Sequence, residues 1–389
     1  MVTAELTGGD LSRLRQLNAL AVIRALREEE ALTLTELARR TKLSRASAED
    51  VVRELMELGW VAEAGATAGS VGRPARRYRF RAEAGRVLGV DIGGHKIRAR
   101  VADLDGEVLH GAEVAVTPEM GRKERLAAVD EAVAEALRGA GVTPAEVWAS
   151  GVATTGLVDG AGRVMLSEAL PEWTGVDVAG HVGRLVNGPV RVENDAKVAA
   201  LAECWRGVAR YARNVVYLLA GLRTGAGLII DGRLHRGFGN AAGEIGALPA
   251  AGWIRAQEHL KSWPATGPGA VEDIFLAARG GDRKAAGIVR RYVRDIALGA
   301  SALVLTLDPE LVVLGGGFSR SADLIAEPLR RELDRWCIRT PEVRVSAFGD
   351  EGVVLGAVRL ALDHVEGVLH GGAELTSPDR FAAGQRPVT

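Results

Sequence analysis

The first sixty residues of the chain place apolar residues at helical spacing in three successive runs. The first run gives a predicted helix one apolar face, at Leu14, Leu17, Ala21, Val22 and Ala25. A short second helix is expected over 33–40, because a threonine stands where it can cap the first turn. Ser44 can cap a third helix in the same way, and that helix has core spacing at Val51, Val52, Leu55 and Leu58.

Three helices with a tight turn before the third are typical of a helix-turn-helix, whose last helix lies in the DNA major groove. Residues 65–81 then have the pattern of a β-hairpin wing, with five arginines within 73–81 and no acidic residue between Gly65 and Arg81. This charge favours contact with DNA phosphates or the minor groove, although a solvated loop on a protein-binding module is the alternative. The expected DNA contacts are Ser44, Arg45 and Ser47 at the start of the third helix and Arg73, Arg76 and Arg77 in the wing.

Beyond Val87 the pattern changes to short apolar runs that alternate with helical segments, which predicts an α/β domain. Strands are expected over 88–92, 97–103, 107–116 and 147–152, with a helix over 122–138. Further along we expect a helix over 196–205, strands over 215–220, 227–230 and 311–314, and a helical stretch across 270–305. The last residues contain Gly, Ser and Pro with little periodicity and predict a flexible tail.

Composition adds a class and a compartment to this picture. At 389 residues, with 47% hydrophobic and 25% charged residues, the chain is expected to form two or three water-soluble domains. Its two cysteines, Cys204 and Cys337, lie far apart, so free thiols are expected. No apolar run reaches membrane-spanning length and no secretion signal is evident at the N-terminus, so a cytoplasmic protein that does not bind a membrane is expected.

The strand that starts the α/β part ends in Asp91-Ile92-Gly93-Gly94. Glycines allow a backbone to approach a phosphate closely, and the aspartate can hold a cation or a water beside it. An unliganded hairpin turn has the same pattern, so this segment acquires weight only from further motifs downstream.

Seven segments follow one another in a fixed order: Asp91-Ile-Gly-Gly94, Gly156-Leu-Val-Asp159, Glu193-Asn-Asp-Ala196, Thr224-Gly-Ala-Gly227, Asp231-Gly232, Gly243-Glu-Ile-Gly246 and Leu314-Gly-Gly-Gly317. Together they resemble the ROK family (repressors, open reading frames and sugar kinases), over residues 87 to about 365. The resemblance implies a two-lobed actin-like (hexokinase-type) ATPase fold, and a winged head ahead of it is the arrangement of the family's sugar-responsive repressors.

The expected architecture is therefore an α+β winged helix-turn-helix head followed by an α/β body. The head spans 1–83 and the sugar-kinase-like domain spans 84–370, with a flexible tail over 371–389. Within the body, lobe one is expected over about 84–188 plus the final helix, and lobe two over about 189–350.

The resemblance also implies a sugar site between the lobes, formed by Gly156, Asn194, Asp195 and Glu244. An asparagine offers a sugar hydroxyl both a donor and an acceptor, and an aspartate accepts a hydrogen bond or removes a proton. In kinases of the family, the aspartate that matches Asp195 is the general base. A plain helix cap is the alternative for Asn194 and Asp195, because both residue types are favoured there.

The nucleotide side matches the family in part. The corresponding residues are expected to be vestigial: Asp91, Gly93, Gly94, Thr224, Gly225, Gly315, Gly316 and Gly317. Arg223 replaces a phosphate-loop glycine, which indicates either a broken ATP loop or a new contact to an acidic ligand or to the protein itself. Ala247 replaces the histidine that holds the family's structural zinc, and 248–275 contains no cysteine, so neither zinc nor ATP is expected as a cofactor.

The leading hypothesis is a sequence-specific repressor that binds double-stranded operator DNA as a homodimer or higher homo-oligomer and responds to a sugar-like effector in a non-catalytic ROK domain. Two alternatives stay open: an ATP-dependent sugar kinase with a DNA-binding head, and a regulator whose sugar pocket has decayed.

Overall fold

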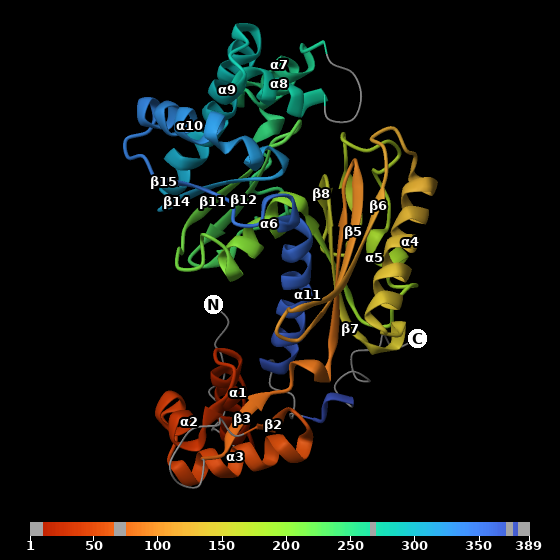
Figure 1. Ribbon diagram of the computed structural model, residues 1–389, viewed down its shortest axis with the longest axis vertical. Helices are drawn as coiled ribbons and strands as arrows, with labels where there is room; N and C mark the ends of the chain where they lie inside the picture. The colour runs from red at the N-terminus through yellow and green to blue at the C-terminus, as the bar shows by residue number, and fades with distance from the viewer. Residues whose placement is uncertain (1–10, 66–74, 265–269, 371–375, 380–389) are drawn as a thin grey trace.

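The computed structural model describes residues 11–65, 75–264, 270–370 and 376–379. Figure 1 shows a small head at the lower end of the view, a sheet lobe beside it (lobe one), and a second sheet lobe with a helical cap at the top (lobe two). Helix α11 (Gly352–His370) runs between the lobes toward the head. The predicted order of a winged head followed by a two-lobed body is confirmed. Among the described residues, no helix is long and apolar enough to cross a membrane.

The head contains the three predicted helices, α1 (Leu11–Arg27), α2 (Leu34–Thr41) and α3 (Arg45–Leu58). Thr33 starts α2 in a capping box, in which its hydroxyl accepts the Glu36 N–H and the Glu36 carboxylate accepts the Thr33 N–H. Gly59, with φ 92°, ends α3 in the left-handed region. A small sheet of order β1-β3-β2 completes the wing base, with β1 (Leu32–Thr33), β2 (Val61–Ala64) and β3 (Arg77–Phe80).

Lobe one is built on a five-stranded sheet of order β10-β7-β4-β5-β6. Strands β4, β5 and β6 form an antiparallel meander, β7 pairs parallel with β4, and β10 pairs parallel with β7. Helices α4 (Arg122–Ala140) and α5 (Val178–Val182) cover one face, and α11 covers the other (Figure 1). The strands are β4 (Arg86–Ile92), β5 (Lys96–Asp103), β6 (Val108–Ala115), β7 (Val147–Thr154) and β10 (Val190–Asn194), followed in space by a hairpin of β8 (Leu157–Val158) and β9 (Val164–Leu166).

Lobe two has a second five-stranded sheet, of order β13-β12-β11-β14-β15. Successive side chains of a strand face opposite sides, so Val216 and Leu218 join the core under the helical cap while Val215 and Tyr217 pack toward α6 and α11. The strands are β11 (Val215–Leu219), β12 (Gly225–Ile230), β13 (Arg233–Leu234), β14 (Leu311–Gly315) and β15 (Glu342–Val345). The helices are α6 (Asp195–Arg206), α7 (Trp253–Lys261), α8 (Ala270–Arg279), α9 (Arg283–Leu307) and α10 (Ala322–Trp336).

Glycines bring α11 into backbone contact on both sides. A Cβ on Gly151 of β7 would lie 1.9 Å from the Ala357 carbonyl oxygen of α11, and a Cβ on Gly356 would lie 1.9 Å from the Val198 carbonyl oxygen of α6. Because real Cβ atoms do not approach that closely, these two positions require glycine. Helix α11 is therefore seated tightly against β7 of lobe one and against α6.

The structure differs from the predicted start of lobe two and from the predicted free tail at 376–379, whereas the helical stretch predicted over 270–305 is confirmed. Strand β10 pairs with β7, so lobe one extends to Asn194 and lobe two begins with α6 instead of near residue 189. The helical stretch over 270–305 is two helices, because Asp282 caps α9 after a Gly-Gly break. The tail is not free throughout, since the Trp60 indole N–H of the head donates to the Thr376 carbonyl at 2.7 Å.

Candidate functional site

The first turn of α3 is an exposed, basic end of the head. The Ser44 hydroxyl accepts the Ser47 N–H at 3.0 Å and lies 2.9 Å from the Ser47 hydroxyl, so these two side chains form the predicted cap. Arg45 is exposed and forms no ion pair with any residue of the described ranges. Lys42, also exposed, lies in the left-handed turn between α2 and α3. Sequence reasoning did not select Lys42, although its place in that turn is the signal.

The later turns of α3 carry mostly acids: Glu49, Asp50, Glu54 and Glu57. The one basic residue there, Arg53, lies 2.5 Å from the Asp50 carboxylate. Because DNA phosphates repel carboxylates, a duplex is expected to meet α3 at its first turn only. This is the end that helix-turn-helix proteins present to base edges.

The wing arginines differ in their surroundings. Arg73 lies outside the described residues. Arg76 is exposed, with its Nε 3.4 Å from Glu63. Arg77 is half-buried, donates to the Ala31 carbonyl before β1 and has a buried Nε, and its DNA contact stays a prediction. Arg79 forms a bidentate salt bridge with Glu83, with its two terminal nitrogens 2.9 and 2.7 Å from the carboxylate oxygens.

In the body, three strand ends meet at one edge of the lobe one sheet. In register, Asp91 lies beside Ala153, and Thr154 lies beside both Ile92 and Asn194. The carboxyl ends of parallel strands are the usual place for ligands in open α/β sheets. The sheet therefore brings Asp91 to the same edge as Asn194 and Asp195, which lie more than a hundred residues further along the chain.

Asn194 acts as the cap of α6. Its carbonyl oxygen accepts the N–H groups of Ala196 and Lys197 at 3.0 and 3.3 Å, and its amide donates to the Gly156 carbonyl at 3.1 Å. Gly156 has φ 105°, a conformation that favours glycine. The cap alternative therefore applies to Asn194, whose amide also fixes the Gly156 loop against the start of α6.

The charge of Asp195 acts on Asp91, and the charge of Glu244 acts on Asp195, and we call these three carboxylates the acidic cluster. Burial raises the pKa of Asp91 to about 7, with a smaller contribution from the charge of Asp195. Burial likewise raises the pKa of Asp195 to about 6, and the charge of Glu244 adds to that shift. Burial also raises the pKa of Glu244. The acidic cluster thus contains two of the predicted ligand residues, Asp195 and Glu244, and one residue of the predicted nucleotide side, Asp91.

A buried ion network that sequence reasoning missed supports this cluster. The Glu193 carboxylate lies 2.6 Å from the Arg236 Nε and 3.9 Å from the Lys197 Nζ. Lys197, almost fully buried, donates to the Asn240 carbonyl, and the Asn240 amide donates to the Val158 carbonyl of lobe one at 2.8 Å. The sequence signal was a lysine four residues after Glu193, across the boundary between β10 and α6. The network ties the loop that carries Glu244 to lobe one.

Basic residues lie on the predicted nucleotide side. The Arg98 guanidinium is buried 3.6 Å from Asp91 and 2.8 Å from Asp350. Arg125, fully buried, donates to the Gly93 carbonyl at 2.7 Å and holds the hairpin turn. A Cβ added to Gly94 would meet only one Leu170 methyl, at 3.8 Å.

The lobe two motifs also meet at one sheet edge, where Leu219 lies beside both Gly225 and Gly315. The buried Tyr292 hydroxyl donates to the Gly221 carbonyl at 3.4 Å, and burial raises its pKa against the opposing effect of a hydrogen bond with Thr224, which precedes Gly225. Arg223 donates to the Glu168 carbonyl of lobe one at 2.6 Å. Of the two interpretations of Arg223, a new contact to the protein is therefore what the structure contains.

The Gly315–Gly317 turn has a packing explanation at two of its positions. A Cβ on Gly315 would lie 2.0 Å from the Tyr217 hydroxyl. Gly316 has φ 84°, and a Cβ there would lie 2.6 Å from the Ala220 carbonyl oxygen. Only at Gly317 would an added Cβ meet no atom within 4 Å, so most of this glycine run is needed for packing whether or not a phosphate binds.

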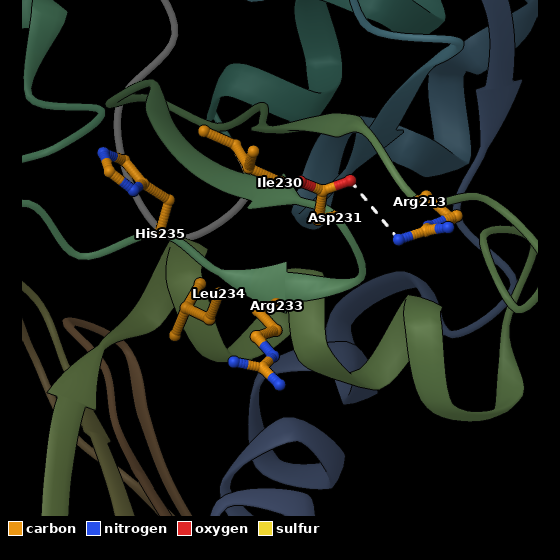
Figure 2. Close-up of a pocket in the computed structure, with 6 residues that line it drawn as sticks. All are labelled: Arg213, Ile230, Asp231, Arg233, Leu234 and His235. Atoms are coloured by element: carbon orange, nitrogen blue, oxygen red, sulfur yellow. Dashed lines mark hydrogen bonds and ion pairs between the residues drawn. The ribbon is translucent and has the colours of Figure 1, made fainter. Parts of the chain in front are cut away.

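A hollow of about 460 Å³ lies on the outer edge of lobe two (Figure 2). Arg213, Asp231, Arg233 and His235 line it together with Ile230 and Leu234, and Arg213 lies 3.4 Å from Asp231. Among the predicted ligand residues, none lines this hollow. The described residues contain no group of three or more potential metal ligands, and His259 pairs with the buried Asp295 at 3.0 Å.

Comparison with known proteins bears on both parts of the chain. The model of the ROK family matches residues 87–267 and 260–364, and the model of the IclR helix-turn-helix domain matches residues 17–65. The xylose repressor of Caldicellulosiruptor bescii is 24% identical over 91% of this chain and 97% of its own length. The glucokinase of Streptomyces coelicolor is 31% identical over 71% of this chain and 98% of its own length.

Solved structures give the same division. A ROK family transcriptional regulator, described as a homologue of the E. coli MLC protein, has a TM-score of 0.67 at 20% identity and covers 92% of this chain and 99% of its own. A ROK family glucokinase from Streptomyces griseus, in complex with glucose and AMPPNP, has a TM-score of 0.62 at 29% identity and covers 72% of this chain and all of its own.

Proposed function

The chain belongs to the ROK family, and from that premise we propose that it is a sugar-responsive, DNA-binding transcriptional repressor. The observation that carries the proposal is a winged head whose hydrophobic core is continuous with that of the sugar-kinase-like body. The xylose repressor and the MLC-like regulator align with head and body together, whereas the glucokinase aligns with the body only. Access to DNA implies a cytoplasmic protein.

The head is proposed to contact DNA through the first turn of α3. Arg45 is exposed there and can reach a guanine edge with two parallel hydrogen bonds, and the Ser47 hydroxyl can bond a base or a phosphate. Arg76 and the wing residues that lie outside the described ranges, Arg73 among them, are proposed to add phosphate contacts. The acidic later turns of α3 support this orientation, because they exclude a docking mode along the whole helix.

The acidic cluster is proposed as the effector site. Near neutral pH, Asp195 and Glu244 in their ionised form accept hydrogen bonds from sugar hydroxyls, and such charge-assisted bonds are stronger than neutral ones. Asn194 contributes by fixing the Gly156 loop and the start of α6 rather than by offering free polar atoms. A neutral sugar or sugar derivative with several hydroxyl groups fits this set of acceptors.

The effector signal is proposed to travel along two helices. Helix α6 begins at the acidic cluster and packs against α11, and α11 ends beside α1 of the head. An effector shifts the protein toward a state with lower operator affinity only if it binds that state more tightly. A two-fold homodimer is proposed as the binding form, since paired heads match paired half-sites on DNA.

We propose that the body has lost catalysis and needs neither zinc nor ATP. Arg98 lies against Asp91 and Arg223 occupies a phosphate-loop position, and both features favour a protein that binds its ligand without phosphorylating it. The rival is an ATP-dependent sugar kinase, which the glucokinase alignment and the position of Asp195 favour. A coupled ATPase assay with a panel of hexoses and N-acetylhexosamines separates them, because turnover that Asp195→Asn abolishes would establish the kinase.

The repressor is tested by selecting bound fragments from sheared genomic DNA and then measuring their release by individual sugars. We expect Arg45→Ala to weaken operator binding by about 1–3 kcal/mol and to relax the base preference at one position. We expect Glu244→Gln to bind the operator normally and to lose release by the sugar. If the wild-type protein selects no sequence in preference to random duplex at moderate salt, the proposal is refuted.

A further inference from the structure

Trp60 is a fully buried residue at which the head and the body meet. It follows Gly59 directly and therefore lies at the end of α3. Its ring stacks on Phe80 of β3, with centroids 6.3 Å apart and planes 12° apart. The same ring meets Trp148 of β7 edge-on at 5.8 Å. One side chain therefore joins the recognition helix, the base of the wing and the lobe one sheet.

The polar edge of this ring is occupied by the C-terminal part of the chain. The Trp60 indole N–H donates to the Thr376 carbonyl at 2.7 Å. Pro378 is buried, and its Cδ lies 3.7 Å from the position that a Cβ on Gly59 would take. A buried indole N–H without a partner is costly, so the segment supplies an acceptor that Trp60 needs. Thr376–Asp379 thus contacts the head where α3 ends.

The two ends of the head are held to the body by different means. Helix α1 is held by Arg27, which lies 2.7 Å from Glu366 of α11 and 3.2 Å from Asp105. The end of α3 is held at Trp60, by Trp148 on one side and by Thr376 on the other. Loss of the Thr376 contact would remove one of the two contacts at the end of α3 and leave those of Arg27 and Trp148 in place.

We propose that Thr376–Asp379 is a strap that positions the recognition helix and the wing on the body, and that operator recognition depends on it. Base contacts require α3 at a fixed angle, whereas phosphate attraction tolerates many orientations. Loss of the strap is therefore expected to weaken binding to the operator and to spare binding to duplexes of random sequence. The inference goes beyond the proposed function, since it concerns a segment outside the head and outside the sugar-kinase-like domain.

The test compares two shortened chains. A chain that ends at residue 375 lacks the strap, and a chain that ends at residue 379 keeps it and serves as the matched control. Binding is measured by fluorescence anisotropy to a duplex selected from random sequences by the full chain, and to a scrambled duplex at low salt. We expect operator affinity to fall about tenfold for the first chain and to stay within about twofold for the second, with scrambled binding unchanged in both.

A point variant gives an independent measurement at the same contact. Trp60→Phe keeps an aromatic ring but removes the donor to Thr376, so operator affinity should fall while scrambled binding holds. Trp336→Phe, at the far end of lobe two on α10, is the control and should change neither. If the strap acts through Trp60, adding Trp60→Phe to the chain that ends at residue 375 should weaken operator binding no further.

Two results would overturn the inference. One is operator affinity in the chain that ends at residue 375 equal to that of the chain that ends at residue 379. The other is an equal loss of operator and scrambled binding, because that pattern means that the segment keeps the head folded instead of orienting α3. A failure of the full chain to select any duplex would count against the proposed function and is seen before either variant is made.

Discussion

The junction between α1 and α11 offers a measurable test of how firmly the head is fixed to the body. The Arg27 guanidinium lies 2.7 Å from Glu366 and 3.2 Å from Asp105, and it also donates to the Leu104 carbonyl at 2.7 Å. Hydrogen bonds from Arg359 and Arg27 lower the pKa of Glu366 even though its burial, the larger influence, opposes them. The perturbation is Arg27→Gln, made alone and together with Glu366→Gln.

The expected size follows from burial. The side chains of Arg27 and Glu366 are 22% and 24% exposed, between a surface pair and a buried one. Charged hydrogen bonds contribute roughly 1.5–3 kcal/mol each, and Arg359 still pairs with Glu366 when Arg27 is lost, so we expect Arg27→Gln to cost about 2 kcal/mol. Exposed pairs contribute about 0.2–1 kcal/mol, so the Arg27–Glu366 coupling should exceed that range at about 1–1.5 kcal/mol.

The assay is a double-mutant cycle on the free energy of unfolding in urea, a denaturant that does not screen charges. The four proteins are the wild type, each single variant and the double variant, and their m-values must agree for the cycle to hold. Arg24 and Glu28, on the same helix, provide a control pair 3.5 Å apart with 81% and 58% exposure. A coupling for Arg27 and Glu366 no larger than the control value would refute a rigid junction at α1.

Three further predictions address the body and the head. Because burial raises the pKa of Asp91 from 3.8 to about 7, the contribution of Asp91 to stability is fully present below about pH 4 and is lost as the pH rises through 7. Asp91→Asn should therefore raise the free energy of unfolding at pH 8 by on the order of 2–4 kcal/mol and change it little at pH 4. Gly151→Ala should destabilise the body by more than about 3 kcal/mol in urea, because its Cβ would meet a backbone oxygen of α11, while Gly160→Ala, in open space, should be nearly neutral. Replacing Arg76 with Gln should lower the slope of log affinity against log salt by about one, and an unchanged slope would count against a phosphate contact.

Local pattern was enough to predict most elements of the chain. The capping residues Thr33 and Ser44 fix where α2 and α3 begin, and the change from helical to alternating spacing marks the start of β4. These features depend on neighbouring residues only, so they can be read without knowledge of the fold. The strand register places the motif residues Asp91 and Asn194 at one sheet edge and Gly225 and Gly315 at another.

What the sequence could not predict depends on partners that are distant along the chain. Strand β10 belongs to lobe one because it pairs with β7, and the residues Val190–Asn194 alone do not predict this pairing partner. Arg77 belongs to the arginine-rich segment that predicts DNA contacts, but its guanidinium donates to the Ala31 carbonyl, a contact that the sequence does not reveal. The Thr376 segment lacks periodicity and so resembles a tail, although Trp60 needs the acceptor that it carries.

The position of α11 explains why a ligand in the body can affect the head at all. Two glycines let the α11 backbone pack directly against β7 and against α6, closer than any side chain would allow. A shift of α11 relative to β7 therefore also changes its contact with α6. Its first residues follow Asp350 and Glu351, which bond Arg98 and Arg100 of β5, and its last turns share a core with Leu26 and Trp60. A change of the angle between the lobes therefore alters how α11 packs at the end near the acidic cluster. Because close-packed elements adopt discrete arrangements, α11 is expected to switch between positions and not to move continuously. The head receives that change because α1 and the end of α3 are both attached to the same rigid unit, and a head on a free linker would receive none of it.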